Sequence, residues 1–158
     1  KGVENAGADM ICVLASTYVE PYNVPANWAP LYEMKEHVSI PVLGNGGLLS
    51  LEEGRNKCQN LDGFLIGQAT FGNPWVFSQV NSQMSFGDKL PTIKNHAQFL
   101  IESKGEVVGT REIRKHLLSY VKHFTGAKAF RSDLAHVDSM EKINHVLDDI
   151  HMAVTQTS

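Results

Sequence analysis

Short apolar runs without polar alternation mark the first half of the chain. They cover residues 9–14 (DMICVL), 40–43 (IPVL) and 63–66 (GFLI), and each is bounded by Gly, Asp or Pro. Runs of this length and composition are typical of strands that are buried on both faces of a parallel sheet. The first half is therefore predicted to contain three parallel strands.

Helical patterns lie between and after these strands. One runs from about Asn27 to His37, and another begins at Ser50, where Ser50 and Glu53 can form a capping box that satisfies free backbone N–H groups. Alternating strands and helices are the pattern of βαβ units. Because three parallel strands alone would expose both sheet edges, we expect these residues to be the last part of a larger α/β barrel.

The second half of the chain has a helical pattern only. Gly87–Pro91 is interpreted as a turn or linker, and no strand-like run follows Trp75. Helices are predicted over 93–104, 110–124, 126–134 and 139–154, with N-caps at Thr92, Thr110 and Ser139. The expected organisation is an α/β domain in residues 1–86 followed by an all-α domain in residues 87–158.

Composition excludes several classes of protein. Apolar residues make up 42% and charged residues 20% of the chain, which is globular composition. No run approaches the roughly 20 apolar residues that cross a bilayer, so no membrane partner is expected. The two cysteines cannot build a disulfide framework, and the histidines lack the spacing of a metal site. We therefore expect no bound metal and a reducing, cytoplasmic compartment.

Charge is distributed unevenly along the chain. The net charge is −3 overall, with −4 in residues 1–86 and +1 in residues 87–158. Residues 111–131 contain six basic side chains and one acidic side chain, Glu112. Such a local excess of positive charge is typical of a surface that binds phosphate groups. A solvated helix face remains the alternative.

Glycines follow two of the predicted strands directly. Gly44-Asn45-Gly46-Gly47 comes after the second strand and Gly67 after the third. Glycine lets backbone N–H groups approach an anion closely, and in barrels the loops after the last two strands commonly hold a phosphate. The pair of loops predicts an anion site, although a glycine cluster on its own can be only a tight turn.

Three segments together resemble the tRNA-dihydrouridine synthase family: IPVLGNGGL, DGFLIGQATFGNPWVF and GTREIRKHLLSYVKHFTGAKAFRSDL, in this order. The resemblance covers nearly the whole chain. It implies an FMN-binding (β/α)8 TIM barrel followed by a helical tRNA-binding domain. It also implies that NADPH reduces the flavin, that hydride passes to the C5=C6 bond of a uridine in tRNA, and that a cysteine protonates C5. Since the chain begins at Lys1 without a methionine, we expect a C-terminal fragment, with the rest of the barrel upstream of Lys1.

The resemblance assigns a cofactor role to the two glycine loops. It implies that Asn45 and Gly46 line the flavin phosphate and ring edge, that Gly47 completes the turn, and that Gly67 and Gln68 close over the phosphate from the other side. The family often has an arginine where Gln68 stands, so one charged contact to the phosphate is expected to be missing. Backbone donors can partly compensate for it.

A second departure lies after the first strand. The family usually has a His-Gly-Arg or His-Ala-Arg motif where this chain has Leu14-Ala15-Ser16. Leu14 and Ser16 cannot donate the same charged hydrogen bonds. The acid of the family belongs to an earlier strand, so no catalytic residue is assigned within this chain. Of the two cysteines, Cys12 is expected to be a buried core thiol, and an exposed position is expected for Cys58.

The basic stretch is assigned to tRNA. Arg111, Lys115 and Lys122 are spaced to form one row on a helix, Arg131 extends the patch, and Arg114 lies beside them. Contacts to phosphates position a folded RNA by its shape rather than by its sequence. His116 and Tyr120 are candidates for stacking on a base, with packing in the helical core as an equal alternative.

Two other functions remain open at this stage. A catalytically inactive relative that binds tRNA without flavin would agree with the changes at Leu14 and Ser16. Another FMN-dependent barrel oxidoreductase, acting on a small molecule, would share the glycine loops but would leave the basic helical stretch unexplained.

Overall fold

A computed structural model describes residues 1–17, 24–78, 84–122, 124 and 126–156 of the chain. It divides into two compact units, Lys1–Thr70 and Phe71–Ser158. In the described residues, no helix is long and apolar enough to span a membrane.

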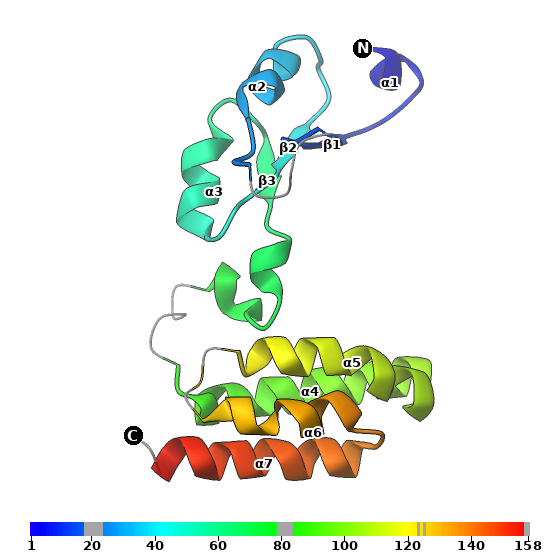
Figure 1. Cartoon of the computed structure of the whole chain (residues 1–158). Coiled ribbons are helices and arrows are strands. Elements are labelled where there is room, and N and C mark those ends of the chain that lie inside the picture. Colours follow the sequence, from blue (N-terminus) through cyan, green and yellow to red (C-terminus); the bar gives the residue numbers. More distant parts are fainter. Residues whose placement is uncertain (18–23, 79–83, 123, 125, 157–158) are drawn as a thin grey trace. The chain divides into compact units, whose positions relative to one another are not determined.

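The first unit is a small α/β unit with a parallel sheet (Figure 1). Its elements are α1 (Gly2–Asn5), β1 (Ile11–Leu14), α2 (Ala29–Lys35), β2 (Val42–Asn45), α3 (Leu51–Cys58), β3 (Gly63–Leu65) and the short 3-10 helix η1 (Gln68–Thr70). The strand order is β1-β2-β3, and both pairings are parallel. The three predicted strands and their parallel arrangement are thus confirmed.

Among the described residues, helices pack on one face of this sheet. The glycine Gly44 leaves room for the indole of Trp28, and Gly54 of α3 lies against the ring of Phe64 on β3. On the other face, Leu14 is 59% exposed and Leu65 39% exposed. The prediction of strands buried on both faces is therefore wrong for this unit, because within the described residues no second layer packs on that face.

The start of α3 confirms part of the predicted cap. The hydroxyl oxygen of Ser50 accepts a hydrogen bond from the Glu53 backbone N–H at 3.1 Å. The Glu53 carboxylate accepts from the N–H of Leu49 at 2.9 Å rather than from Ser50 itself. Two of the free donors at this helix end are thus satisfied.

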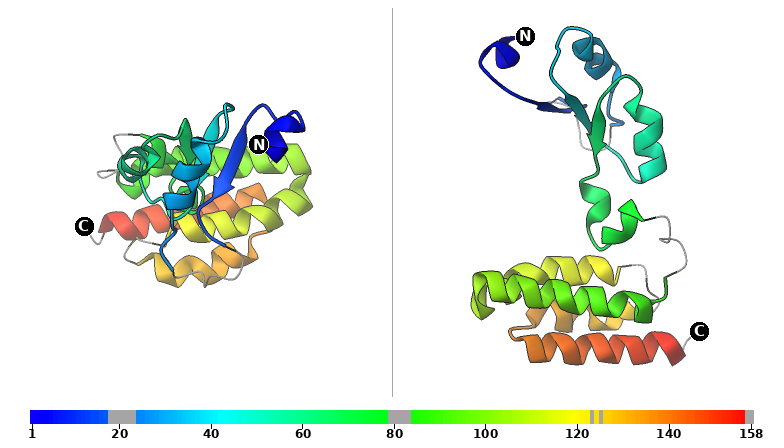
Figure 2. Two further views of the ribbon diagram at one scale, coloured as in Figure 1. Left: turned by 90° about the horizontal axis from the view of Figure 1, so that it is seen from above. Right: turned by 180° about the vertical axis from the view of Figure 1, so that it is seen from behind.

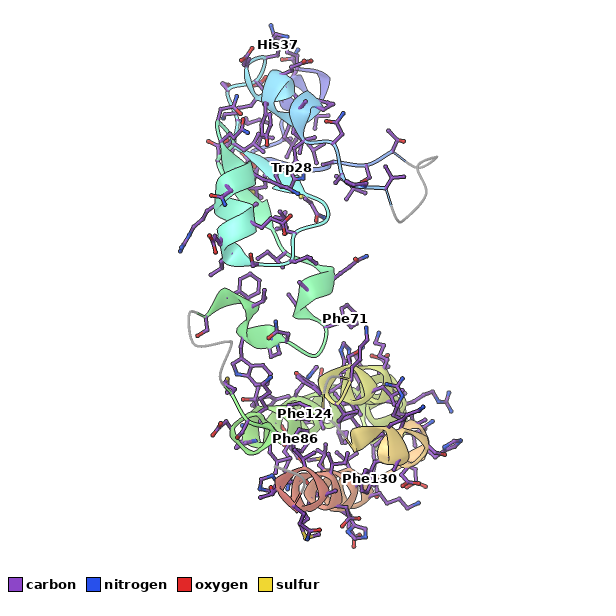
Figure 3. The ribbon with its side chains drawn as sticks, turned by 60° about the vertical axis from the view of Figure 1, so that its left-hand side comes forward. Trp28, His37, Phe71, Phe86, Phe124 and Phe130 are labelled. Atoms are coloured by element: carbon purple, nitrogen blue, oxygen red, sulfur yellow. The ribbon has the colours of Figure 1, made fainter. Side chains whose placement is uncertain are left out.

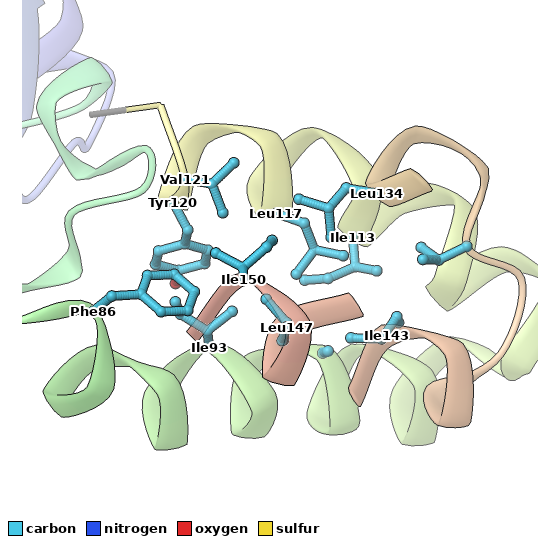
Figure 4. Close-up of a cluster of buried hydrophobic side chains, with 12 residues drawn as sticks. Phe86, Ile93, Ile113, Leu117, Tyr120, Val121, Leu134, Ile143, Leu147 and Ile150 are labelled. Carbon is cyan, nitrogen blue, oxygen red and sulfur yellow. The ribbon is translucent and has the colours of Figure 1, made fainter. Parts of the chain in front are cut away.

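The second unit is built of helices (Figure 1), and Figure 2 shows it from above and from behind. Its elements are η2 (Pro74–Phe77), α4 (Phe86–Lys104), α5 (Glu106–Tyr120), η4 (Ala127–Phe130), α6 (Arg131–His136) and α7 (Met140–Gln156). Apolar side chains from α4, α5, α6 and α7 meet in one core (Figure 4), which includes Phe86, Ile93, Ile113, Leu117, Leu134, Ile143, Leu147 and Ile150.

Two predicted helix starts are wrong. The segment Gly87–Pro91 is the first part of α4, whose cap is Ser85: its hydroxyl accepts from the Asp88 N–H at 3.2 Å, and the Asp88 carboxylate accepts from the Ser85 N–H at 2.8 Å. Thr92 consequently lies inside the helix. Gly87 lies in the first turn, whereas Pro91 lies inside the helix and has no backbone N–H to donate to the Gly87 carbonyl.

The next helix also begins earlier than predicted. α5 starts at Glu106, and the hydroxyl of Thr110 donates within the helix to the Glu106 carbonyl at 2.5 Å. It ends at Tyr120, short of the predicted residue 124, and residue 123 lies outside the described residues. The cap at Ser139 is confirmed, since its hydroxyl accepts from the Lys142 N–H at 3.2 Å.

The division between the units falls 16 residues before the predicted position, at Thr70/Phe71 rather than 86/87. Segment 71–77 packs on the helices of its own unit. The ring of Trp75 meets Tyr120 edge-on at 6.1 Å, and Gly72, with φ of 70°, lies directly against the backbone of Ser119. Tertiary packing therefore assigns this segment to the helical unit.

Candidate functional site

The loop after β2 is held by contacts on its carbonyl oxygens. The Asn45 carbonyl accepts from the Ala15 N–H at 2.7 Å, and the Gly46 carbonyl accepts from the indole N–H of Trp28 at 3.2 Å. Gly46 and Gly47 have φ of 143° and 66°, values that side-chain-bearing residues rarely adopt. A Cβ at Gly46 would lie 3.3 Å from the Ala15 methyl. Glycine is thus required at this turn.

The loop after β3 leads into a short helical turn. The Gly67 carbonyl accepts from both the N–H and the hydroxyl of Thr70, at 3.0 and 2.6 Å. Gln68 is exposed and is the first residue of η1. Space around Gly67 is open, because a Cβ there would meet nothing within 4 Å.

The sheet register brings these two loops to one edge. Asn45 on β2 is the partner of Leu65 on β3, so the chain leaves both strands on the same side of the sheet. In the part of the chain that the structure describes, the backbone N–H groups of Gly47, Gly67 and Gln68 donate no hydrogen bond. Unpaired N–H groups at such an edge can bind an anion such as a phosphate.

One groove of the first unit lies away from these loops. A groove of about 590 Å³ in the first unit is lined by residues of α2 and its surroundings: Lys1, Pro30, Glu33, Met34, His37 and Val38. None of the loop residues lines it.

The basic residues of the second unit do not form the single row that their spacing predicts. Arg111 and Lys115 are exposed one turn apart on α5, whereas Lys122 is exposed beyond the end of that helix. Arg131 is exposed at the start of α6. Arg114 is half-buried, and its Nε donates to the Val137 carbonyl at 2.8 Å, which gives it a structural role.

The one acid in this stretch is already paired. The Glu112 carboxylate lies 2.6 Å from the Nζ of Lys104, and this bond lowers the pKa of Glu112. In the described residues, Arg111, Lys115, Lys122 and Arg131 form no ion pair with a carboxylate. Four cations thus remain free to contact phosphates.

A ring cluster lies beside these cations. Phe71 and His116 are stacked, with centroids 5.2 Å apart and planes at 13°. The ring of His96 lies 4.9 Å from that of His116, and its Nδ1 is 3.1 Å from the hydroxyl of Tyr120. Phe71 and His96 were missed by the sequence reasoning, since no local spacing connects positions so far apart along the chain.

Burial changes the acidity of this cluster. It lowers the pKa of His96 and His116 below the ordinary value, and the pKa of His116 is lowered further by the charges of His96 and Lys115. Burial also raises the pKa of the Tyr120 hydroxyl. Both imidazoles and the phenol are therefore neutral near pH 7.

Comparison with known proteins identifies the family. The model of the family described as "Dihydrouridine synthase (Dus)" matches residues 1–156. The chain belongs to the dihydrouridine synthase family. This confirms the family that the three sequence segments indicated.

Named relatives agree with this membership. The chain is 33% identical to tRNA-dihydrouridine synthase B of Pseudomonas syringae pv. tomato, over 84% of the chain and 42% of that relative. It is 28% identical to a probable tRNA-dihydrouridine synthase of Mycobacterium leprae, over 96% of the chain and 42% of the relative. The chain thus spans less than half the length of these two relatives.

Leu14 and Ser16, which the sequence resemblance marks as departures, lie at the end of β1 and just beyond it. Leu14, the partner of Asn45 in the sheet, is exposed on the uncovered face. Ser16 is half-buried beyond the end of β1. An apolar side chain therefore stands beside the candidate cofactor loop.

The two cysteines lie in different environments. Cys12 is exposed on the edge strand β1, so its predicted burial is wrong; alternate residues of β1 lie on the uncovered face. Cys58 is partly buried, and its Sγ donates to the Leu61 carbonyl at 3.4 Å. Burial raises the pKa of the Cys58 thiol, with a smaller contribution from Asp62. In the described residues, no group of three or more His, Cys, Asp or Glu side chains is arranged to hold a metal ion.

Proposed function

We propose that this chain is the C-terminal part of a flavin-dependent tRNA-dihydrouridine synthase. The observation that carries the proposal is the pair of glycine loops at one edge of the parallel sheet, with unpaired N–H groups on Gly47, Gly67 and Gln68. Membership of the dihydrouridine synthase family supplies the reaction class.

The first unit is proposed to complete a TIM barrel. Its uncovered sheet face carries Cys12, Leu14 and Leu65 in exposed positions, which is costly for apolar side chains in water. Further strands of the same protein would cover this face and would extend the sheet beyond β1 and β3. These strands would come from sequence upstream of Lys1, consistent with the share of the relatives that the chain spans.

The loops fit the phosphate of FMN. Gly46 adopts a conformation that a Cβ would disturb, and the free N–H groups supply donors for an anion. Asn45, Gly46 and Gly47 would hold the phosphate from one side, and Gly67 and Gln68 from the other. When bound, FMN supplies the hydride chemistry for a uridine C5=C6 bond, with NADPH as the source of electrons.

The second unit is proposed to hold the tRNA. Arg111, Lys115, Lys122 and Arg131 are exposed and would contact phosphates, which position a folded RNA by shape. A uridine in tRNA must leave its stack to reach a barrel mouth, so binding elsewhere on the RNA is needed to offset that cost. Arg114 is not included in this contact set, because it caps the Val137 carbonyl.

The decisive experiment uses the full-length protein. Purified protein should carry flavin absorbance, and with NADPH it should convert uridine in an unmodified tRNA transcript to dihydrouridine, as detected by mass spectrometry of the nucleosides. Bound flavin with no product from any tRNA would contradict the proposal and would favour a small-molecule substrate.

Leu14 supports one competing function. An apolar side chain beside Asn45 cannot donate a charged hydrogen bond to a cofactor or to a base. A relative that binds tRNA without flavin would show no flavin absorbance but would retain salt-dependent tRNA binding. The same purified protein therefore distinguishes the two functions.

A further inference from the structure

An aromatic side chain stands exposed at the start of the helical unit. Phe71, labelled in Figure 3, is 52% exposed, although its ring is stacked on His116 with the planes 13° apart. By contrast, Tyr120 is only 6% exposed and belongs to the core. A single exposed ring is common on a protein surface, so its surroundings decide what it can do.

The stacking contact with His116 holds the Phe71 ring in position. His116 contacts His96, whose Nδ1 is 3.1 Å from the Tyr120 hydroxyl, so the stack rests on a residue of the core. The backbone next to Phe71 is also constrained, since Gly72 has φ of 70° and lies against Ser119 without room for a Cβ. Phe71 and His116, which we call the ring platform, are thus preorganised.

Positive charge adjoins the ring platform. Lys115 precedes His116 on α5 and is close enough for its charge to lower the pKa of that imidazole. Arg111 lies one turn earlier and is exposed, and Glu112 is occupied by Lys104. A planar aromatic surface next to unpaired cations is complementary to an unpaired nucleotide, which carries a π face and a phosphate.

We propose that the ring platform binds an unpaired base of the tRNA by stacking on Phe71, while Lys115 and Arg111 contact the adjoining phosphates. This inference rests on the proposed function, because it takes tRNA as the partner. It adds a recognition element that reads single-stranded structure, whereas phosphate contacts alone would not distinguish a loop from a duplex.

The test compares two RNAs in the full-length protein. Phe71→Leu should raise the Kd for an unmodified tRNA transcript by about 5- to 150-fold, the range expected for losing one base stack. Its slope of affinity against salt should stay that of the wild type, because stacking releases no counterions. Binding of a blunt RNA duplex should be unaffected.

Two further variants keep the test interpretable. Phe71→Trp retains a stacking ring, so it should bind tRNA like the wild type, and its added tryptophan fluorescence should be quenched by tRNA. Phe99→Leu removes another exposed aromatic ring, 67% exposed on α4, and should leave both affinities unchanged.

The outcomes separate this inference from the proposed function. If the wild type binds tRNA and Phe71→Leu binds it equally well, the ring platform is not a base site. The same conclusion follows if Phe71→Leu weakens duplex binding as much as tRNA binding. If the wild type binds no tRNA and forms no dihydrouridine, the proposed function itself fails.

Discussion

At the scale of single residues, the candidate cofactor loop depends on the absence of one Cβ. Gly46 has φ of 143°, and an added methyl would lie 3.1 Å from the Ala26 Cβ. Gly46→Ala should strain the loop by about 1–3 kcal/mol, equivalent to about 5- to 150-fold weaker retention of flavin. The measurement is flavin absorbance per mole of purified full-length protein. Gly2→Ala is the matched control, because a Cβ there meets nothing within 4 Å; equal flavin content in both variants would contradict the assignment.

A second prediction at this scale concerns the exposed cations. Replacing Lys115, Lys122 and Arg131 by glutamine should weaken tRNA binding and should reduce the slope of log affinity against log salt by about 0.7–0.9 per lost phosphate contact. The control is Lys142→Gln, since Lys142 is already paired with Asp138 at 2.7 Å. Binding titrations at several salt concentrations measure both quantities, and an unchanged slope would show that these cations do not contact RNA.

At the scale of secondary-structure elements, the start of α4 is decided by Ser85 rather than by Thr92. Ser85→Ala removes a reciprocal cap and should lower the free energy of unfolding by about 0.5–2 kcal/mol. Thr92→Ala, in contrast, should be neutral or slightly stabilising, because Thr92 is exposed inside the helix and alanine has the higher helix propensity. Chemical denaturation of the two variants measures the difference. If only Thr92→Ala destabilised the protein, Thr92 would be the helix cap and Gly87–Pro91 would be a linker, as the sequence predicted.

The limits of sequence reasoning at this scale follow from local signals. Gly87 and Pro91 suggested a turn, yet both lie in a helix that buries Phe86 and Ile93. Ser50 and Ser139 were identified correctly, because their capping bonds involve neighbours three residues away. The Ser85–Asp88 pair has the same three-residue spacing but was missed, because Gly87 and Pro91 beside it suggested a turn. Local capping signals are therefore predictable only where no competing turn signal lies next to them.

At the scale of the whole molecule, the helical unit should lose stability in mild acid. Burial lowers the pKa of His96 and His116 below the ordinary 6.5. Below about pH 6.5 the unfolded chain thus binds more protons than the folded unit, and the free energy of unfolding falls as pH decreases. Melting should occur at lower temperature at about pH 5.5 than at about pH 7.5.

A control assigns this effect to the histidines. His96→Gln should reduce the difference between the two pH values, since it removes one of the two imidazoles. Carboxylates such as Asp88 and Glu112, whose pKa values are lowered below 3.8 and 4.5 by hydrogen bonds to Ser85 and Lys104, stay ionised throughout this range. A melting temperature that is equal at both pH values would contradict the buried, neutral imidazoles.

Local sequence determined the types of element and the family of this protein. Three apolar runs predicted β1, β2 and β3, and three segments in order indicated the dihydrouridine synthase family. The strands are encoded by residues close together in the chain, because short apolar runs between Gly, Asp or Pro are local signals.

Tertiary structure alone decided what those elements bury and bring together. Only packing shows that Cys12 and Leu14 lie on an uncovered face, that segment 71–77 belongs to the helical unit, and that Arg114 is tied to a backbone carbonyl. The ring platform likewise joins Phe71 to His116 across 45 positions of sequence. Such contacts depend on how separate helices and loops pack against one another, and no local pattern encodes that choice.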